Sequence, residues 1–225
     1  MLLKSSITGL ALGMVLVSGS AFAYQKGDFV ARAGAAAVDP RESSSELKLN
    51  GGDVAGSYAG VDGNTQLGLT FAYMVSDHVA LELLGATPFS HTVTAYVPGL
   101  GTVDAAKVKH LPPTLSVSYF PMDSASALQP YVGIGLNYTT FFDTKVASDL
   151  KGVFGDGKVS LDDSYGLAFE VGCDYQVTDQ IIVNAAIWKA DIDTTANFKF
   201  DSGNTIDAKV QIDPMVYMLA VGYKF

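Results

Sequence analysis

Apolar side chains recur at every second position in the last stretch of the chain, residues 209–225. Counted back from the C-terminus, the alternate positions hold Phe225, Tyr223, Val221, Leu219, Tyr217 and Met215. Because side chains on a β-strand alternate between its two faces, this stretch predicts a strand with one strongly apolar face. A strand of this kind that ends on an aromatic residue is typical of a membrane barrel, in which aromatic girdles lie at the lipid–water boundary.

Seven earlier stretches alternate in the same way: residues 29–38, 65–75, 79–89, 111–120, 130–142, 165–175 and 181–193. Each is about ten residues long, which is the length that a tilted membrane strand needs. With the last stretch they make eight, an even number, as in bacterial outer-membrane barrels. The pattern therefore predicts an all-β fold, an eight-stranded antiparallel transmembrane β-barrel.

The connections between these stretches alternate in length. Three are short, residues 75–78, 121–129 and 177–180, and four are long and rich in Gly, Asp and Ser, residues 39–64, 90–110, 143–164 and 194–208. Short turns on one side and long loops on the other, with both termini on the short-turn side, fit an outer-membrane barrel. A soluble lipocalin-like barrel is the alternative, but its large apolar side chains would face inward. Here the side chains on the opposite face of the strands are too small and too neutral for a face in contact with water, which favours the membrane barrel.

The first 23 residues have the features of a secretory signal peptide: a positive charge near the start, a short apolar core at residues 7–17 and a small-x-small cleavage site ending at Ala23. A membrane anchor is the alternative, but the apolar run is too short to span a bilayer. We therefore expect residues 1–23 to be removed and residues 24–225 to form the barrel domain.

The composition narrows the range of partners. The formal net charge is −9, and an acidic surface repels nucleic acid. Cys173 is the single cysteine, so an intramolecular disulfide is excluded. Beyond residue 23 no stretch approaches twenty uninterrupted apolar residues, so a chain that enters the membrane must do so as a closed barrel with every backbone group paired.

The inward-facing positions divide into a charged and an apolar group. A lumen charge cluster is expected toward the short-turn end, formed by Arg32, Glu82, Glu170 and Asp174. Since buried charges need partners, we expect Arg32 to pair with Glu82 or Glu170 and to close the base of the barrel. The cluster could serve only to satisfy the barrel interior or could act as a gate, and the first role is favoured.

Toward the long-loop end the inward positions are mostly apolar, and they are the candidate ligand-lining residues: Trp188, Leu84, Ala86, Thr139, Ala190 and, from the adjacent loop, Leu100. Eight strands enclose a space that side chains fill or that holds one small ligand, so a wide aqueous pore is not expected. Strand parity points Trp188 inward, among neighbours without charge. A one-residue bulge would instead make it a girdle aromatic facing lipid.

Catalytic chemistry finds little support. The three histidines lie at predicted strand ends or in a loop: His78, His91 and His110. None has a second His or Cys at metal-ligand spacing, and no Ser lies in a nucleophile-elbow context. His91 or His110 with Ser90 and Asp104 is the one candidate catalytic group. The acidic stretch 156–163 lacks the rhythm of a calcium loop and is expected to be a solvated loop. We therefore predict no enzyme, no metal site and no cofactor.

Six blocks carry a resemblance to a known family: residues 64–71 (NTQLGLTF), 82–89 (ELLGATPF), 110–115 (HLPPTL), 130–143 (beginning PYVG and ending NYTTFFD), 191–197 (DIDTTAN) and 222–225 (GYKF). Together they resemble the OmpW family of small outer-membrane barrels. The resemblance implies a narrow, largely hydrophobic lumen and passage of small hydrophobic molecules, with exit sideways into the bilayer. It also implies that Phe225 and Tyr223 form the terminal signal read by the barrel-assembly machinery.

The expected function is a narrow hydrophobic channel or binding pocket for small apolar molecules in the outer membrane of a Gram-negative bacterium. The expected partners are outer-membrane lipids and lipopolysaccharide, the barrel-assembly machinery and small hydrophobic molecules, while the oligomeric state stays open. The alternative is a structural or stress-linked surface barrel that acts through its extracellular loops as an adhesin or as a phage or bacteriocin receptor.

Overall fold

The computed structural model describes residues 23–225. The predicted signal peptide lies outside these residues except for Ala23, so its removal stays a prediction. Within the described part of the chain, no helix is long and apolar enough to cross a membrane.

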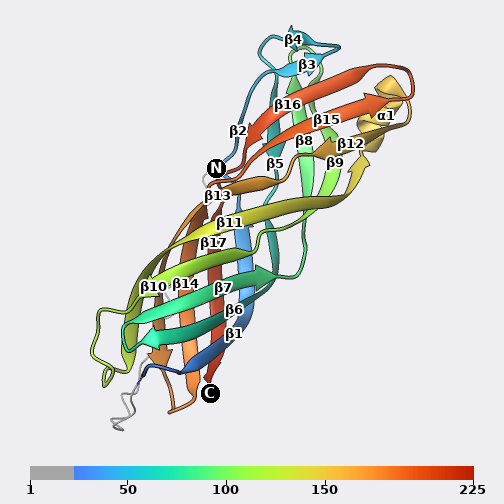
Figure 1. The fold of residues 1–225 in the computed structure, drawn as a ribbon. Coiled ribbons are helices and arrows are strands. Elements are labelled where there is room, and N and C mark those ends of the chain that lie inside the picture. Colours follow the sequence, from blue (N-terminus) through green and yellow to red (C-terminus); the bar gives the residue numbers. More distant parts are fainter. Residues whose placement is uncertain (1–22) are drawn as a thin grey trace, which may run out of the picture.

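Eight antiparallel strands close into a barrel (Figure 1). They are β1 (Phe29–Asp39), β6 (Asn64–Ser76), β7 (Val79–Ala86), β10 (Thr114–Tyr119), β11 (Leu128–Val146), β13 (Ser164–Gln176), β14 (Ile181–Ala190) and β17 (Met215–Lys224). Neighbours around the barrel follow the order β10-β7-β6-β1-β17-β14-β13-β11, and β10 pairs with β11 to complete it. Each predicted alternating stretch forms one of these strands, so the predicted fold class is confirmed.

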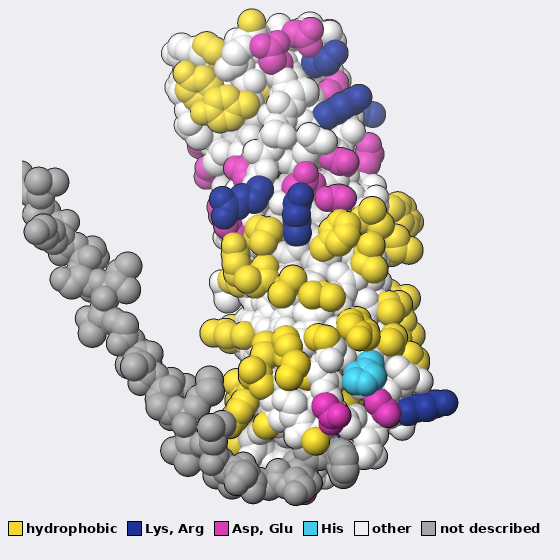
Figure 2. Space-filling view, turned by 90° about the vertical axis from the view of Figure 1, so that its left-hand side faces the viewer, with side chains coloured by type: hydrophobic (Ala, Val, Ile, Leu, Met, Phe, Trp, Pro, Cys, Tyr) yellow, Lys and Arg dark blue, Asp and Glu magenta, His cyan; other side chains and the backbone are white. Residues whose placement is uncertain are grey.

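The barrel exposes its large apolar side chains and buries its small ones. On β17, Leu219 is 70% exposed and the next residue inward, Met218, is 2% exposed. The same contrast holds across the pair of β10 and β11, where Leu136 is exposed and Ser116 is buried. Figure 2 shows the resulting apolar band across one face of the lower half of the molecule, with charged side chains above it and near the lower end. A lipocalin-like barrel would have the opposite arrangement and is excluded.

The expectation that the four long connections are irregular loops is wrong. Most of their residues form a second, upper layer of β-structure above the apolar band, which we call the extension (Figure 1). Its elements are β2 (Ser43–Ser44), β3 (Leu47–Leu49), β4 (Gly52–Val54), β5 (Tyr58–Val61), β8 (Phe89–Val97), β9 (Gly101–Leu111), α1 (Ser148–Phe154), β12 (Gly157–Leu161), β15 (Asp193–Phe200) and β16 (Thr205–Gln211). The acidic stretch 156–163 is likewise mostly strand β12 and not a loop.

Two groups of strands build the extension. Strands β5, β8 and β9 continue the barrel sheet from the upper part of β11, and β12, β15, β16, β3 and β4 form a separate sheet. Their inner faces pack on each other through alternate apolar residues such as Val108 on β9 and Phe198 and Val210 on β15 and β16. The interior of the molecule therefore runs on from the barrel lumen into an apolar core above it.

Candidate functional site

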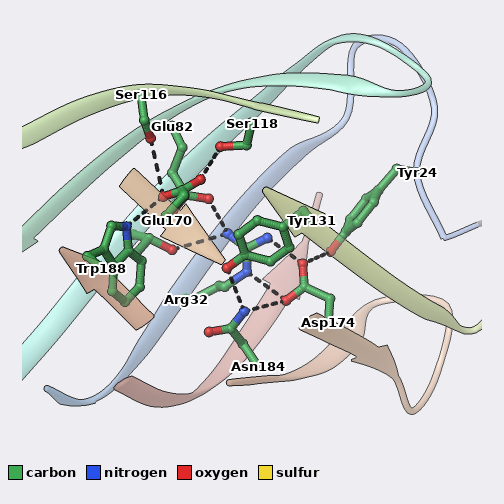
Figure 3. Close-up of polar contacts among 11 residues, drawn as sticks. Tyr24, Arg32, Glu82, Ser116, Ser118, Tyr131, Glu170, Asp174, Asn184 and Trp188 are labelled. Carbon is green, nitrogen blue, oxygen red and sulfur yellow. Dashed lines mark hydrogen bonds and ion pairs between the residues drawn. The ribbon is translucent and has the colours of Figure 1, made fainter. Parts of the chain in front are cut away.

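Arg32, on β1, is the centre of a buried polar network at the base of the lumen (Figure 3). Its Nη1 lies 2.9 Å from Glu82 Oε2 on β7, and its Nη2 lies 2.5 Å from Asp174 Oδ2 on β13. Both pairs are almost fully buried. The expected pairing with Glu82 is confirmed, whereas the second partner is Asp174 and not Glu170. Two carboxylates thus compensate the buried guanidinium, as a charge removed from water requires.

Aromatic and amide side chains complete this basal network. The Tyr24 hydroxyl donates to Asp174 Oδ2 at 2.5 Å, and Asn184 Nδ2 donates to Asp174 Oδ1 at 2.8 Å and to the Tyr131 hydroxyl at 3.0 Å. The guanidinium carbon of Arg32 lies 5.7 Å from the centroid of the Tyr131 ring, within cation–π range. The network joins side chains of β1, β7, β11, β13 and β14 across the inside of the barrel (Figure 3).

Trp188, on β14, points into the lumen and is 2% exposed, so the inward parity is confirmed and the girdle alternative is wrong. The expectation that its surroundings are without charge is also wrong. Its Nε1 donates to Glu170 Oε2 at 2.5 Å, and Glu170 accepts further hydrogen bonds from the hydroxyls of Ser118 and Ser116 (Figure 3). A buried indole N–H needs an acceptor, and Glu170 supplies it. Trp188 therefore forms the upper boundary of the polar region.

Above Trp188 the lumen is mostly apolar, with one hydrogen-bonded polar group formed by Thr114, Asn137 and Thr139. A cavity of about 30 Å³, the lower cavity, is lined by Trp188 together with the predicted Leu84, Ala86 and Ala190. Thr139 is also buried inside the barrel, but it does not line this cavity. Its hydroxyl donates to Oδ1 of Asn137 at 2.7 Å, and Asn137 is a lining residue. All five residues thus lie inside the barrel as predicted, and Thr139 differs only in that it does not line the cavity.

Leu100 does not belong to this group. It lies in the turn between β8 and β9 at the far end of the extension and is 60% exposed. It lines a different cavity, which we call the upper cavity. The prediction failed here because residues 90–110 form a long hairpin that carries Leu100 away from the barrel.

Three cavities follow one another from the extension down to Trp188. The upper cavity has about 170 Å³, a middle cavity about 40 Å³ and the lower cavity about 30 Å³. The upper and middle cavities share Val93 and Phe198, and the middle and lower cavities share Val38 and His110. Their linings are overwhelmingly apolar. These three adjoining cavities narrow toward Trp188, and together we call them the apolar passage. Its wide end is comparable to an engineered cavity of roughly 150 Å³ that holds benzene.

Two histidines that the sequence analysis treated as alternatives line the middle cavity together. His91 on β8 and His110 on β9 are buried, and their Nε2 atoms lie 2.9 Å apart. His91 Nδ1 lies 2.6 Å from the carbonyl oxygen of Asp62. Both residues are at inward positions of the paired strands β8 and β9. Their proximity could therefore be predicted from the sequence, but only if residues 90–110 are recognised as a hairpin.

This histidine pair lies above the apolar band. Lys109, the residue before His110, points outward and its Nζ forms an ion pair with Asp143 Oδ2 at 2.8 Å. Burial lowers the pKa of His91, and burial together with the neighbouring His91 lowers the pKa of His110 to about 3. Both rings are therefore neutral near pH 7.

The candidate catalytic group is not assembled. Ser90 and Asp104 are exposed on the outer face of the hairpin, opposite to the face that carries His91 and His110. Across residues 23–225, no group of three or more His, Cys, Asp or Glu side chains is placed to hold a metal ion.

The terminal aromatics cluster at the lower rim of the barrel. The rings of Tyr223 and Phe225 lie 4.8 Å apart edge to face, and the Phe225 ring lies 5.8 Å from that of Phe29. The backbone N–H of Phe225 donates to the Phe29 carbonyl at 2.8 Å. The C-terminus is thus fixed to the first strand, while its role as an assembly signal stays a prediction.

The closed eight-stranded barrel, its lipid-facing apolar band and its plugged, narrow lumen define a small β-barrel membrane protein. The profile of the OmpW family matches residues 25–225. The chain is 44% identical over 227 residues to outer membrane protein W of Vibrio cholerae serotype O1, which covers 99% of this chain and 100% of that relative. The chain therefore belongs to the OmpW family.

Structural and more distant similarities agree with this assignment. The crystal structure of outer membrane protein OprG from Pseudomonas aeruginosa matches with a TM-score of 0.86 and 45% identity, over 91% of this chain and 99% of that chain. A relative 27% identical over 187 residues, 82% of each chain, is named dibenzothiophene metabolism operon protein PahQ of Pseudomonas aeruginosa. Outer membrane protein W and OprG are outer-membrane barrel proteins and not known enzymes. This barrel likewise lies in the outer membrane of a Gram-negative bacterium.

Proposed function

We propose that this barrel binds small apolar molecules in the apolar passage and transfers them into the outer membrane. The observation that carries the proposal is the succession of three adjoining cavities with overwhelmingly apolar walls, from the extension to Trp188. Burial of apolar surface is worth roughly 25 cal/mol per Å², so such walls favour alkyl and aromatic compounds over sugars and ions.

The basal network supports a route that does not run straight through the barrel. Arg32 and its carboxylate partners occupy the lumen below Trp188, and an apolar molecule would have to displace them at high cost. Exit through the barrel wall above this network, into the bilayer, agrees with the closed base. The relative named for an operon of dibenzothiophene metabolism adds support, since dibenzothiophene is an apolar aromatic compound.

The fluorescence of Trp188, the single Trp of the chain, tests the proposal. Protein refolded into lipid vesicles is titrated with 1-fluorohexane, and the emission of Trp188 should change saturably, whereas glycerol should have no effect. Ala190→Leu fills the lower cavity and should abolish the change. Ala185→Leu places the same side chain on the lipid face of the same strand and should retain it. A response that is unsaturable, or equal in both variants, would show that the probe only dissolves in the bilayer.

A further inference from the structure

The hydrogen bonds of the histidine pair determine where each ring carries its proton. His91 Nδ1 lies 2.6 Å from the Asp62 carbonyl oxygen and 3.7 Å from Asp62 Oδ1. Both oxygens can only accept, so His91 Nδ1 must carry a hydrogen. A neutral imidazole has a single N–H, so His91 Nε2 is left as an acceptor.

The second ring follows from the first. With His91 Nε2 as the acceptor, the 2.9 Å contact between the two rings requires His110 Nε2 to carry the hydrogen. Neutral His110 then has an unprotonated Nδ1. The low pKa of both rings supports the neutral forms that this assignment needs. The pair is therefore an ordered relay in which each ring donates toward Asp62.

His110 Nδ1 is the open end of this relay. It is a buried acceptor, and no hydrogen-bond donor among residues 23–225 reaches it. The His110 side chain is 7% exposed and lines both the middle and the lower cavity, between the rings of Phe89 and Phe141. A buried acceptor without a donor costs free energy comparable to its lost hydration, and a bound molecule with a donor would recover that cost.

We propose that the apolar passage selects apolar molecules that carry one hydroxyl group, alcohols or phenols, and that His110 Nδ1 accepts the hydrogen bond from this hydroxyl. The inference rests on the proposed function, because it names the class of molecule that the same passage binds. Molecules whose polar atom can only accept a hydrogen bond should bind more weakly than alcohols or phenols, since two acceptors that face each other form no hydrogen bond.

The sizes of the cavities fit a molecule with one hydroxyl group and an apolar tail. The middle cavity has about 40 Å³, more than the roughly 10–15 Å³ that a cavity needs to hold one water molecule. A hydroxyl fits in this space beside His110, and the wider upper cavity can hold the apolar remainder. A molecule in this orientation has its tail in the extension and its hydroxyl toward the barrel.

The test compares hexan-1-ol with 1-fluorohexane, in which fluorine of similar size replaces the hydroxyl and cannot donate. Both are titrated into refolded protein in vesicles while Trp188 emission is followed. The two compounds partition differently into lipid. For each variant we therefore divide the half-saturation concentration of one compound by that of the other, and we compare this ratio between variants. Partitioning then cancels.

His110→Phe removes the acceptor and keeps an aromatic ring of related shape. The preference for hexan-1-ol over 1-fluorohexane should fall roughly three- to tenfold relative to the unmodified protein, the range expected for one net hydrogen bond. His78→Phe is the matched control, because His78 is exposed in the turn between β6 and β7 at the opposite end of the barrel. This variant should keep the full preference.

A measurement on the unmodified protein covers the case in which His110→Phe does not fold. In protein labelled with 15N at histidine, the nitrogen resonance of His110 Nδ1 should be that of an unprotonated atom. It should move toward a hydrogen-bonded value on addition of hexan-1-ol and not of 1-fluorohexane. A protonated Nδ1, or equal shifts with both compounds, would overturn the inference.

The possible failures are distinguishable. Saturable binding of both compounds with the same ratio in His110→Phe and in the unmodified protein would refute the hydroxyl preference and leave the proposed function standing. Absence of saturable binding for either compound would refute the proposed function and this inference with it.

Discussion

At the scale of single residues, Arg32 shows how much of the interior depends on one side chain. It is the cation to which both Glu82 and Asp174 are paired, in a space that water does not reach. Removal of one partner of a buried ion pair costs about 3–5 kcal/mol because the remaining charge is left uncompensated. Arg32 is thus expected to contribute as much to stability as a large buried apolar side chain.

Arg32→Met should lower the free energy of unfolding of the refolded barrel by about 3–5 kcal/mol, measured by urea titration with Trp188 emission as the signal. Arg41→Met is the matched control, since Arg41 forms an exposed ion pair with Asp39, and it should change the value by about 1 kcal/mol or less. Equal effects of the two substitutions would mean that the basal network is hydrated.

His110 predicts a pH dependence. Its pKa is lowered from 6.5 to about 3 in the folded protein, by burial first and by His91 second. Between these values the unfolded chain binds more protons than the folded chain, so the stability that depends on neutral His110 falls as the pH drops below about 6.5. Urea titrations from pH 7.5 to pH 4 should therefore show a shallower loss of stability in His110→Phe than in His78→Phe. If the stabilities of the two variants depended on pH in the same way, His110 would not be buried as the structure shows.

The network was only partly predictable from the sequence. Parity along each strand placed Arg32, Glu82, Glu170, Asp174 and Trp188 inside the barrel, because the side-chain period of a strand is two. It did not predict that Arg32 pairs with Asp174 while Glu170 accepts from Trp188. Which groups meet across a lumen depends on the tilt and stagger of strands far apart in sequence, and no single strand contains that information.

At the scale of elements, the barrel strands were predictable and the strands of the extension were not. A lipid-facing strand such as β17 needs large apolar side chains on one face, which gives a strong alternation. The strands of the extension face water instead, so Asp, Lys, Ser and Thr occupy their outer positions, and the composition resembles that of loops. Inward residues such as Ala196, Phe198 and Phe200 do alternate, but over a shorter run.

Strand β17 carries a prediction about assembly. Phe225 packs on Phe29 and Tyr223, so its deletion removes both ring contacts and the terminal aromatic side chain. The amount of folded, heat-modifiable barrel in isolated outer membranes should fall. Phe29→Ala removes a ring contact but retains the terminus, and it should have a smaller effect. If the two variants assemble equally in cells and refold equally in vesicles, the terminal residue acts only through packing.

At the scale of the whole molecule, we expect the extension to lie outside the cell and the short turns in the periplasm, because outer-membrane barrels have short periplasmic turns and longer extracellular loops. In a Cys173→Ser background, Ser202→Cys in the turn between β15 and β16 should react with a membrane-impermeant maleimide on intact cells. Asp179→Cys, in the turn between β13 and β14, should react only after the outer membrane is permeabilised. Labelling of Asp179→Cys on intact cells would reverse the orientation.

The pairing of β1 with β17 has a consequence for the order of the strands along the chain. The two strands pair from Val30 with Lys224 to Asp39 with Met215, so the chain ends meet at one rim. A circular permutant, with these ends joined by a short flexible linker and new ends opened at residues 177–180, would retain every pair of neighbouring strands. Such ends in exposed turns are usually tolerated. The permutant should therefore refold in vesicles, yet fail to insert in cells if the C-terminal aromatic is what the assembly machinery reads. That result would mean that the fold of the barrel does not depend on which strand comes first in the chain. The strand order would matter only for insertion into the outer membrane by the assembly machinery.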